Sequence, residues 1–580
     1  MKRLKTGSTS SFGRLAANYF GIPGTGEFLL AVALSALLLV LRIASLLHQR
    51  FDSDEPQHLH VIWSWTQGLI QYRDVFDNHM PLFHIALAPI AGFIGERPTI
   101  LHWMRFVLLP FYLVSMGATY RIATELFSRR VGVWSVIALG FYPSYQSNAS
   151  EFRPDNVWAP LWLLCLIVLL GGAINFRRAL IAGLLLGLCF GVSMKSTVLL
   201  ISLLFSAPLV VVLIGREKLN LPAVRLLGYA AIFLAATGLI PVVIMIFLWL
   251  KGVWSDFSYC VFEHQFFGHL YRQKQILLLG TFLLMFPVVI YVVRRVLTAS
   301  ADFQLGCRRA FVVLVACCYF LALKAFWPLI PRSDYLPFYP LAFVLLTGVL
   351  FAFTEQVNRS GWRVGRILQL LPLPGLVAIL ELLLLLETRP FWKDQTRRET
   401  NILRDILTLT AQRDYVFDCK GETIFRRRPF RPVLETITME RIRRGLMTDD
   451  APQRCIETNT CVAATIMSWR LSPGTREFVE RNYLPVTENL RVAGVVLKSS
   501  YRNPQQRNFE VLIPADYKII ARDGIVSGTL DGSAYHGARF LGAGPHTFDS
   551  TSTSGPIICL WAQAVDRNFT PVLPNISFQR

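Results

Sequence analysis

Long apolar runs, spread over the first two-thirds of the chain, constrain the fold more than any other feature. A helix needs about 17–25 mainly apolar residues to cross the hydrocarbon layer of a bilayer. The segments that approach this length are 28–47, 106–123, 131–146, 157–174, 180–194, 197–214, 226–250, 276–293, 310–324, 336–353 and 367–386. The pattern predicts a mainly α, polytopic membrane protein with about eleven transmembrane helices. Three of these runs (131–146, 180–194 and 310–324) are short, so the number of transmembrane helices can differ from eleven by one or two.

The basic residues set the expected orientation. Of the 580 residues only 17% are charged, yet the net charge is +20. The basic residues in question are Lys2, Arg3, Lys5, Arg14, Arg129, Arg130, Arg177, Arg178, Arg216, Lys218, Arg294, Arg295, Arg308, Arg309, Arg359, Arg363 and Arg366. They fall before the first span and in every second gap, and positively charged short loops stay on the cytoplasmic side. We therefore expect a cytoplasmic N-terminus, the other loops outside, and no nucleic-acid partner.

The chain divides by composition into four regions. We expect a cytoplasmic N-terminus at 1–27, a transmembrane domain at 28–387, an extracytoplasmic α/β region at 388–490 and a β-rich module at 491–580. The first apolar run has no small-residue cleavage site, which indicates a retained signal anchor. In the tail, Cys455 and Cys461 flank a short loop, and an oxidising compartment permits a disulfide between them.

The first predicted outer loop carries the strongest signal of chemistry. It reads Phe51-Asp-Ser-Asp-Glu-Pro-Gln-His-Leu-His60. Pro56 suits the first turn of a helix, so Asp54 and Glu55 would lie at its N-terminus, where the dipole favours carboxylates. His58 follows Asp54 on the same helix face. Two tryptophans follow, which is typical of a helix in the membrane interface. An ordinary polar loop with a capped interfacial helix would explain the same residues.

Other polar groups lie beside predicted spans on the same side. Asp77 and His79 precede an apolar stretch, and Arg153 and Asp155 precede the span at 157–174. Polar groups at membrane depth are costly unless they pair or serve a site. The alternatives are a structural histidine and a structural Arg–Asp pair.

Three further residues on this side could contact a phosphate: Lys195, Arg332 and Tyr335. Lys195 lies between two apolar runs, and the other two precede a span. Cationic and hydroxyl groups suit phosphate binding. Snorkelling at the membrane interface is the alternative reading, above all for Lys195.

The order of these motifs resembles the GT-C superfamily of polyprenyl-phosphate-sugar-dependent glycosyltransferases. The similar branch is that of bacterial family 39/83-like enzymes, relatives of protein O-mannosyltransferases and of the lipid A aminoarabinose transferase. The resemblance covers about 28–355. It implies a bacterial inner-membrane enzyme that moves a sugar from a polyprenyl phosphate to a glycolipid, glycan or protein.

Particular residues match the family's motifs. Asp54, with Glu55 beside it, stands at the first-loop aspartate, Asp155 at the second-loop acidic residue and Tyr335 at the tyrosine before the late span. His79 stands where many relatives have lysine, a departure from the family's phosphate-contacting position. The resemblance favours metal-independent chemistry, so no metal ligand is predicted, although Asp54 and Glu55 could together hold a divalent cation.

A mechanism follows from this resemblance and from the needs of the reaction. Asp54 and Asp155 are the expected catalytic residues: Asp54 as the base for a weakly nucleophilic hydroxyl, Asp155 to orient this acceptor or the basic groups. Direct displacement would invert the anomeric carbon. The expected substrate-binding residues are Glu55, His58, His79, Arg153, Lys195, Arg332 and Tyr335.

Two other functions would fit a polytopic chain of this kind. A transporter or lipid-sugar flippase would line a midplane pathway with its charged residues. A membrane scaffold would bind a partner through its tail and would not need Asp54. The acidic motifs lie beside the spans rather than within them, which favours the transferase.

Overall fold

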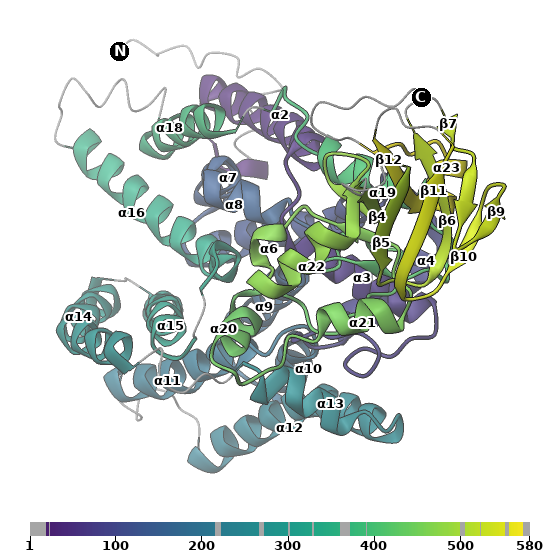
Figure 1. The fold of residues 1–580 in the computed structure, drawn as a ribbon. Helices are drawn as coiled ribbons and strands as arrows, with labels where there is room; N and C mark the ends of the chain where they lie inside the picture. Colours follow the sequence, from purple (N-terminus) through teal and green to yellow (C-terminus); the bar gives the residue numbers. More distant parts are fainter. Residues whose placement is uncertain are drawn as a thin grey trace, which may run out of the picture.

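The computed structural model describes residues 19–22, 24–214, 222–265, 272–299, 302–327, 330–359, 372–389, 391–498, 505–521, 524–551 and 556–571. The topology prediction also rests on Lys2, Arg3, Lys5, Arg14, Arg216, Lys218, Arg363 and Arg366, which lie outside these residues. The described part is mainly helical, as predicted, with strands in the C-terminal tail (Figure 1).

Helices make up the chain before the tail. They are α2 (Thr25–His48), α3 (Asp54–Thr66), α4 (Leu82–Ile94), α5 (Ile100–Val107), α6 (Leu109–Leu126), α7 (Arg129–Phe141), α8 (Pro143–Ala149), α9 (Asp155–Leu170), α10 (Phe176–Val192), α11 (Ser196–Ile214), α12 (Ala223–Leu250), α13 (Trp254–Ser258), η3 (Tyr259–Glu263), α14 (Arg272–Ala299), α15 (Phe303–Phe326), η4 (Arg332–Tyr335), α16 (Tyr339–Arg359) and α18 (Leu373–Thr388).

Six described segments are long and apolar enough to cross a membrane. They are Thr25–His48, Ile100–Leu126, Ser196–Leu213, Val224–Leu250, Phe303–Phe326 and Tyr339–Val357. The shorter helices Leu82–Ile94 and Asp155–Leu170 are also apolar. The polytopic architecture is thereby confirmed, whereas the total of about eleven spans stays a prediction.

Small residues allow two of these helices to approach closely. A Cβ on Gly183 of α10 would lie 2.4 Å from the carbonyl oxygen of Phe233 on α12, and one on Gly187 would lie 2.8 Å from that of Thr237. Glycine at such positions is typical of helix packing in membranes. The contact fixes α10, whose end at Val192 leads directly into the loop that carries Lys195.

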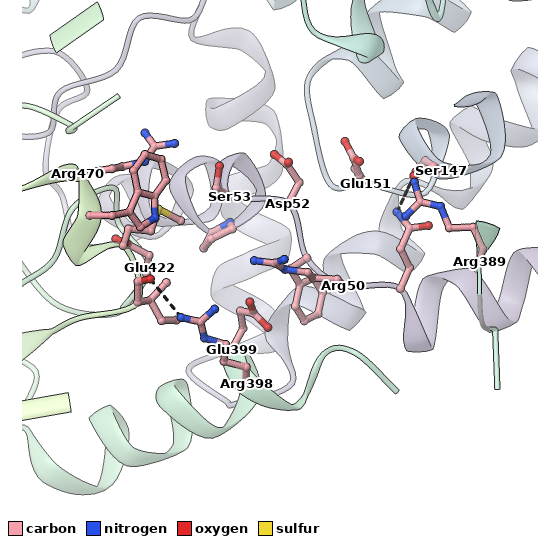
Figure 2. A pocket seen from close by; sticks show the side chains of 16 residues that line it. Arg50, Asp52, Ser53, Ser147, Glu151, Arg389, Arg398, Glu399, Glu422 and Arg470 are labelled. Atoms are coloured by element: carbon pink, nitrogen blue, oxygen red, sulfur yellow. Dashed lines mark hydrogen bonds between the residues drawn. The ribbon is translucent and has the colours of Figure 1, made fainter. Parts of the chain in front are cut away.

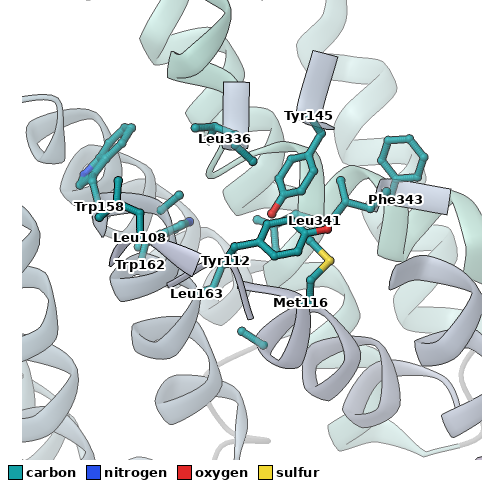
Figure 3. Packing of buried hydrophobic residues seen from close by; sticks show 14 of the residues in the cluster. Leu108, Tyr112, Met116, Tyr145, Trp158, Trp162, Leu163, Leu336, Leu341 and Phe343 are labelled. Carbon is teal, nitrogen blue, oxygen red and sulfur yellow. The ribbon is translucent and has the colours of Figure 1, made fainter. Parts of the chain in front are cut away.

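Aromatic side chains fill the space between other helices. Tyr112 of α6 and Tyr145 of α8 have ring centroids 6.4 Å apart, and Leu341 and Phe343 of α16 belong to the same buried cluster (Figure 3). This packing holds α8 against α6. The loop after α8, which carries Arg153, is therefore anchored to the helical core.

The tail contains helices and two sheets. Its elements are α19 (Arg397–Leu409), β1 (Val416–Phe417), α20 (Thr436–Arg443), α21 (Ala451–Glu457), β2 (Val462–Ala464), η5 (Ser468–Arg470), α22 (Pro473–Asn482), β3 (Tyr483–Pro485), β4 (Leu490–Leu497), β5 (Gln506–Val511), β6 (Ala515–Ala521), β7 (Gly524–Ile525), β8 (Gly528–Leu530), β9 (Ser533–Tyr535), β10 (Arg539–Leu541), β11 (Gly544–Ser550), β12 (Ile557–Trp561) and α23 (Ala562–Asp566). Figure 1 shows the strands gathered on one side of the helices.

The larger sheet runs through both predicted parts of the tail. Its strand order is β1-β2-β4-β12-β6-β10, with β3 paired to β4 and β7 paired to β6. The second sheet has the order β5-β11-β8-β9. Because β4 pairs with β2 on one side and β12 on the other, the predicted boundary between 490 and 491 falls at the edge of a strand inside one sheet.

The expected disulfide is not formed. All ten cysteines lie in the described part of the chain and are free, including Cys455 and Cys461. Both are buried in the apolar core of the tail. Their packing role there is that of small apolar residues.

The tail covers part of the helix α3, whose place in a membrane interface stays a prediction. His60 Nδ1 lies 2.7 Å from the carbonyl oxygen of Ile424, and Arg426 Nη1 lies 3.0 Å from Glu96 Oε2 in the loop after α4. Trp63 is 4% exposed and its indole donates to Glu96. Docking of the tail therefore buries part of this segment and encloses the polar residues around it.

Candidate functional site

The first-loop motif folds into a capped helix start. The helix begins at Asp54, as predicted, with Pro56 in its first turn. The backbone N–H of Asp54 donates to Asp52 Oδ1 (2.9 Å), and that of Asp52 donates to Glu55 Oε1 (2.8 Å). These local bonds satisfy donors that a helix N-terminus leaves free and hold the backbone at the start of α3.

Arg153 joins the two predicted catalytic carboxylates. Its Nη2 lies 2.7 Å from Asp54 Oδ2, and its Nε lies 3.4 Å from Asp155 Oδ2. A third acidic group, Asp52, lies 3.0 Å from Nη1. Residues about one hundred positions apart in the sequence thus meet around one buried guanidinium.

Lys195 extends this network to the loop before α16. Its ammonium donates to Asp155 Oδ1 (3.0 Å) and to Asp334. Asp334 is completely buried and lies in η4, between the two predicted residues Arg332 and Tyr335. Lys195 is therefore a buried member of the site, and a lipid-facing snorkelling role is excluded for it.

The tail contributes a lysine that sequence analysis missed. Lys420 Nζ is bonded to Asp54 and lies 3.2 Å from the hydroxyl of Ser53. Gly421 makes this approach possible: its φ is +88°, and a Cβ there would lie 3.0 Å from the Cβ of His60. No motif surrounds Lys420, and its role rests entirely on how the tail docks on α3.

The turn that presents Lys420 is held by one carboxylate. Asp418 accepts hydrogen bonds from the backbone N–H groups of Gly421 (2.8 Å) and Thr423 (3.0 Å), and from Arg428 Nε (2.6 Å). Burial would raise the pKa of Asp418, but Arg428, His60 and the hydrogen bonds from Thr423 outweigh it and lower that pKa. The turn is therefore held by an ionised group.

Charge pairing keeps the centre of the network ionised. Burial would raise the pKa of Asp54, but Arg153 and Lys420 outweigh it and hold that pKa well below its usual range. Burial would lower the pKa of Arg153 and of Lys195, and the carboxylates around each of them raise it instead. The site therefore holds a carboxylate whose basicity is suppressed by two cations.

Asp334 differs from the other carboxylates of the network. Burial raises its pKa to about 6, and Lys195 only partly opposes this. Asp334 therefore takes up a proton in mildly acidic conditions, while Asp54 stays ionised. Lys195 then has Asp155 as its charged partner.

The oxygens of Glu55 are occupied by protein groups. Arg105 donates from Nη2 to Oε1 (2.6 Å) and from Nε to Oε2 (2.7 Å), and both side chains are completely buried. The backbone N–H groups of Asp52 and Phe152 each donate to this carboxylate at 2.8 Å. The pair ties α3 to α5 and to the loop before α9, so it supports the site structurally. The substrate-binding role of Glu55 stays a prediction.

Two predicted histidines lie together next to this network. The rings of His58 and His79 have centroids 4.6 Å apart, and His79 Nδ1 lies 2.8 Å from Asp77 Oδ1. Burial lowers the pKa of His58 well below its usual value. Burial also acts to lower the pKa of His79, but Asp77 outweighs it and raises that pKa. His79 and Asp77 thus form a charge-assisted pair.

The last two predicted residues lie at the edge of the network. Arg332 is exposed, and the ring of Tyr335 lies 5.9 Å from that of Tyr339 and 5.3 Å from the ammonium of Lys324. Asp334, between them, is the residue that contacts Lys195. The predicted motif therefore lies beside this network, whereas its central residue, Asp334, was not among the predicted site residues.

A cavity of about 620 Å³ opens beside Asp54, between the membrane domain and the tail. Figure 2 shows Asp52, Ser53 and Glu151 on one wall and Glu422 and Arg470 on the other. The cavity is lined by charged groups of both signs, which suits a polar, hydroxyl-rich molecule. It gives a substrate access to the immediate neighbours of Asp54.

Comparisons with known proteins agree with this architecture. Residues 99–244 match the model of a family described as dolichyl-phosphate-mannose-protein mannosyltransferase. No curated protein sequence matches the chain.

Solved structures show a similar fold. ArnT from Cupriavidus metallidurans in the apo state has a TM-score of 0.52 and 14% identity, covering 80% of this chain and 97% of that one. The same protein bound to undecaprenyl phosphate has a TM-score of 0.52 and 13% identity, with the same coverage. The archaeal oligosaccharyltransferase AglB from Archaeoglobus fulgidus has a TM-score of 0.44 and 13% sequence identity, covering 82% of this chain and 73% of that one. The resemblance to the GT-C superfamily of membrane glycosyltransferases is thus confirmed, by the family match over residues 99–244 and by the ArnT-like fold.

Proposed function

We propose that this protein transfers a sugar from a polyprenyl phosphate to an acceptor hydroxyl on the extracytoplasmic side of a bacterial inner membrane. The observation that carries the proposal is the meeting of Asp54 and Asp155 at Arg153, with Lys195 and Lys420 beside them. The ArnT structure with undecaprenyl phosphate supports the class of donor.

The charge balance of the reaction suits this network. The donor is a phosphodiester with one negative charge, and the released polyprenyl phosphate is a monoester with up to two. Chemistry therefore adds negative charge to the phosphate, and preorganised cations at that place stabilise the transition state. Arg153, Lys195 and Lys420 are the buried cations available for it, and His79 lies beside them.

Binding of the donor also makes Asp54 a stronger base. In the ligand-free protein Arg153 and Lys420 hold the pKa of Asp54 low. An anionic phosphate that takes hydrogen bonds from these two cations weakens their hold on Asp54, so the pKa of its carboxyl rises. A base whose pKa lies closer to the working pH accepts a proton more effectively. The arrangement therefore couples donor binding to activation of Asp54.

The transfer step then runs in one displacement. The acceptor hydroxyl gives its proton to Asp54, and its oxygen forms a bond to the anomeric carbon. The bond from that carbon to the phosphate oxygen breaks, and its electron pair stays with the phosphate. Attack opposite the leaving group inverts the anomeric carbon. Asp155 keeps Arg153 and Lys195 in place, and the 620 Å³ cavity receives the acceptor, a glycolipid, glycan or protein.

Mass spectrometry of the cell envelope tests this function. Glycolipids and glycoproteins are compared in cells that lack the gene and in cells complemented with wild type, Asp54→Asn or Lys518→Met. Lys518 forms a surface ion pair with Asp566 in the tail, and its variant serves as the control. We expect one sugar to disappear without the gene and to return with wild type and Lys518→Met only. Full recovery with Asp54→Asn at equal protein levels contradicts the proposal.

A further inference from the structure

We propose that His58, Asp77 and His79 bind a divalent transition-metal ion of the zinc class. One ligand atom from each of these residues lies within 4.8 Å of the other two. The ligands come from two segments, because His58 is on α3 and the other two lie in the loop before α4. An ion would therefore join this loop to the helix that begins at Asp54.

A buried lone pair at the centre of this cluster supports the proposal. His58 is completely buried, and its Nε2 has no hydrogen-bond partner among the described residues. Its other ring nitrogen, Nδ1, lies 3.0 Å from His84 Nε2. A buried polar atom without a partner destabilises the folded state. A bound ion would remove this cost.

The neighbours of His58 determine which of its nitrogens carries the lone pair. His84 Nδ1 lies 3.5 Å from Asp77 Oδ2, and a proton on this atom is favoured by the carboxylate. His84 Nε2 then accepts from His58 Nδ1, which leaves His58 Nε2 unprotonated. A second nitrogen hydrogen-bonded to a fixed partner is the usual arrangement for a metal-binding histidine.

Asp77 is oriented in the same way. Gln71, which is not one of the three ligands, donates to Asp77 Oδ2 (2.7 Å). Asp77 and Gln71 are both completely buried. Hydrogen bonds of this kind fix the direction of carboxylate ligands.

The chemistry of the ligands selects the ion. Two imidazoles and one carboxylate suit Zn²⁺ and its neighbours, whereas Mg²⁺ and Ca²⁺ prefer oxygen ligands alone. Ligands about 2.0–2.2 Å from a tetrahedral ion lie about 3.3–3.6 Å from one another, so the cluster contracts by about an ångström on binding. Three protein ligands leave one position open, and the partly exposed His79 lies on the accessible side.

The metal content of the purified protein tests this site without reference to sugar transfer. The full chain in detergent is stripped with a chelator, dialysed against a small excess of ZnCl₂, and analysed by elemental mass spectrometry. We expect about one tightly bound Zn²⁺ per chain in wild type, and binding weaker by more than about 10-fold in His79→Gln and Asp77→Asn. His102→Gln is the matched control, since the ring nitrogen of His102 lies near the carbonyl oxygen of Leu47 and the hydroxyl of Thr396, neither of which belongs to the cluster.

A second readout distinguishes this site from the ten free cysteines. With Co²⁺ in place of Zn²⁺, nitrogen and oxygen ligands give visible absorption without an intense thiolate charge-transfer band. We expect the visible bands to disappear in His79→Gln. Because the His79 side chain is partly exposed, we expect this variant to fold and to elute from a size-exclusion column as wild type does. Equal zinc binding by wild type, Asp77→Asn and His79→Gln, or a thiolate band, would overturn the proposal. Failure of the sugar-transfer assay alone leaves these readouts unaffected.

Discussion

Lys420 is supplied by the tail, yet its ammonium is bonded to Asp54 at the start of α3. The substitution Lys420→Met removes this charge and keeps most of the side-chain volume. The Lys420 side chain is 6% exposed, so water does not easily replace its ammonium. The proposed mechanism gives Lys420 a hydrogen bond to the donor phosphate, which the methionine cannot make.

The size of the effect follows from the kind of contact that is lost. A hydrogen bond to a charged group contributes about 1.5–3 kcal/mol. This corresponds to a loss of about 10- to 100-fold in kcat/KM. Removal of Lys420 also releases Asp54 from one of its two cations, so its pKa rises and part of the loss in kcat is offset. We therefore expect most of the loss in kcat/KM to come from a higher KM for the donor, and the smaller part from a lower kcat.

The assay is sugar transfer by the purified protein in lipid nanodiscs, with a polyprenyl-phosphate sugar at several concentrations. Lys420→Arg, which keeps the charge, should recover most of the activity. Lys518→Met removes a tail lysine whose partner is Asp566, and it should behave as wild type. An unchanged or lower KM for Lys420→Met would refute the assignment of Lys420 to the phosphate.

Three further substitutions test the framework around the site. Glu55→Gln breaks the buried pair with Arg105, which we expect to cost about 3–5 kcal/mol and to lower the melting temperature in detergent. Burial and Asp418 raise the pKa of Glu422 from 4.5 to about 7, so the folded state loses about 3 kcal/mol as pH rises through this range. Glu422→Gln should therefore flatten the fall in melting temperature between pH 5 and pH 8, and an equally steep fall would contradict this. Gly183→Ala puts a methyl group against the backbone of α12 and should cost about 1–3 kcal/mol, whereas Gly238→Ala, which meets nothing within 4 Å, should not.

Local patterns were sufficient to predict the elements that carry the site. Apolar runs located the membrane helices, and the Asp-Glu-Pro sequence placed a helix start at Asp54. Asp54 and Asp155 were singled out separately along the sequence, and the structure brings both to Arg153.

Contacts made by docking could not be read from the sequence. Lys420 lies 366 positions from Asp54, in a segment without a motif, and reaches it only because the tail covers α3. The burial of Trp63 likewise could not be read from its place in the sequence. Asp334 was passed over because a buried acidic residue beside a span shows its role only through its partner, Lys195.

The most direct test of the account is a single-turnover measurement of sugar transfer with purified protein and excess enzyme over donor. Wild type, Asp54→Asn and Asp155→Asn are compared, with Lys518→Met as the control. Loss of a positioned base costs about 10²–10⁴ in rate, so Asp54→Asn should lie in this range below wild type, with Asp155→Asn also slow. Transfer by Asp54→Asn at the wild-type rate would contradict the central claim that this carboxylate accepts the proton of the acceptor.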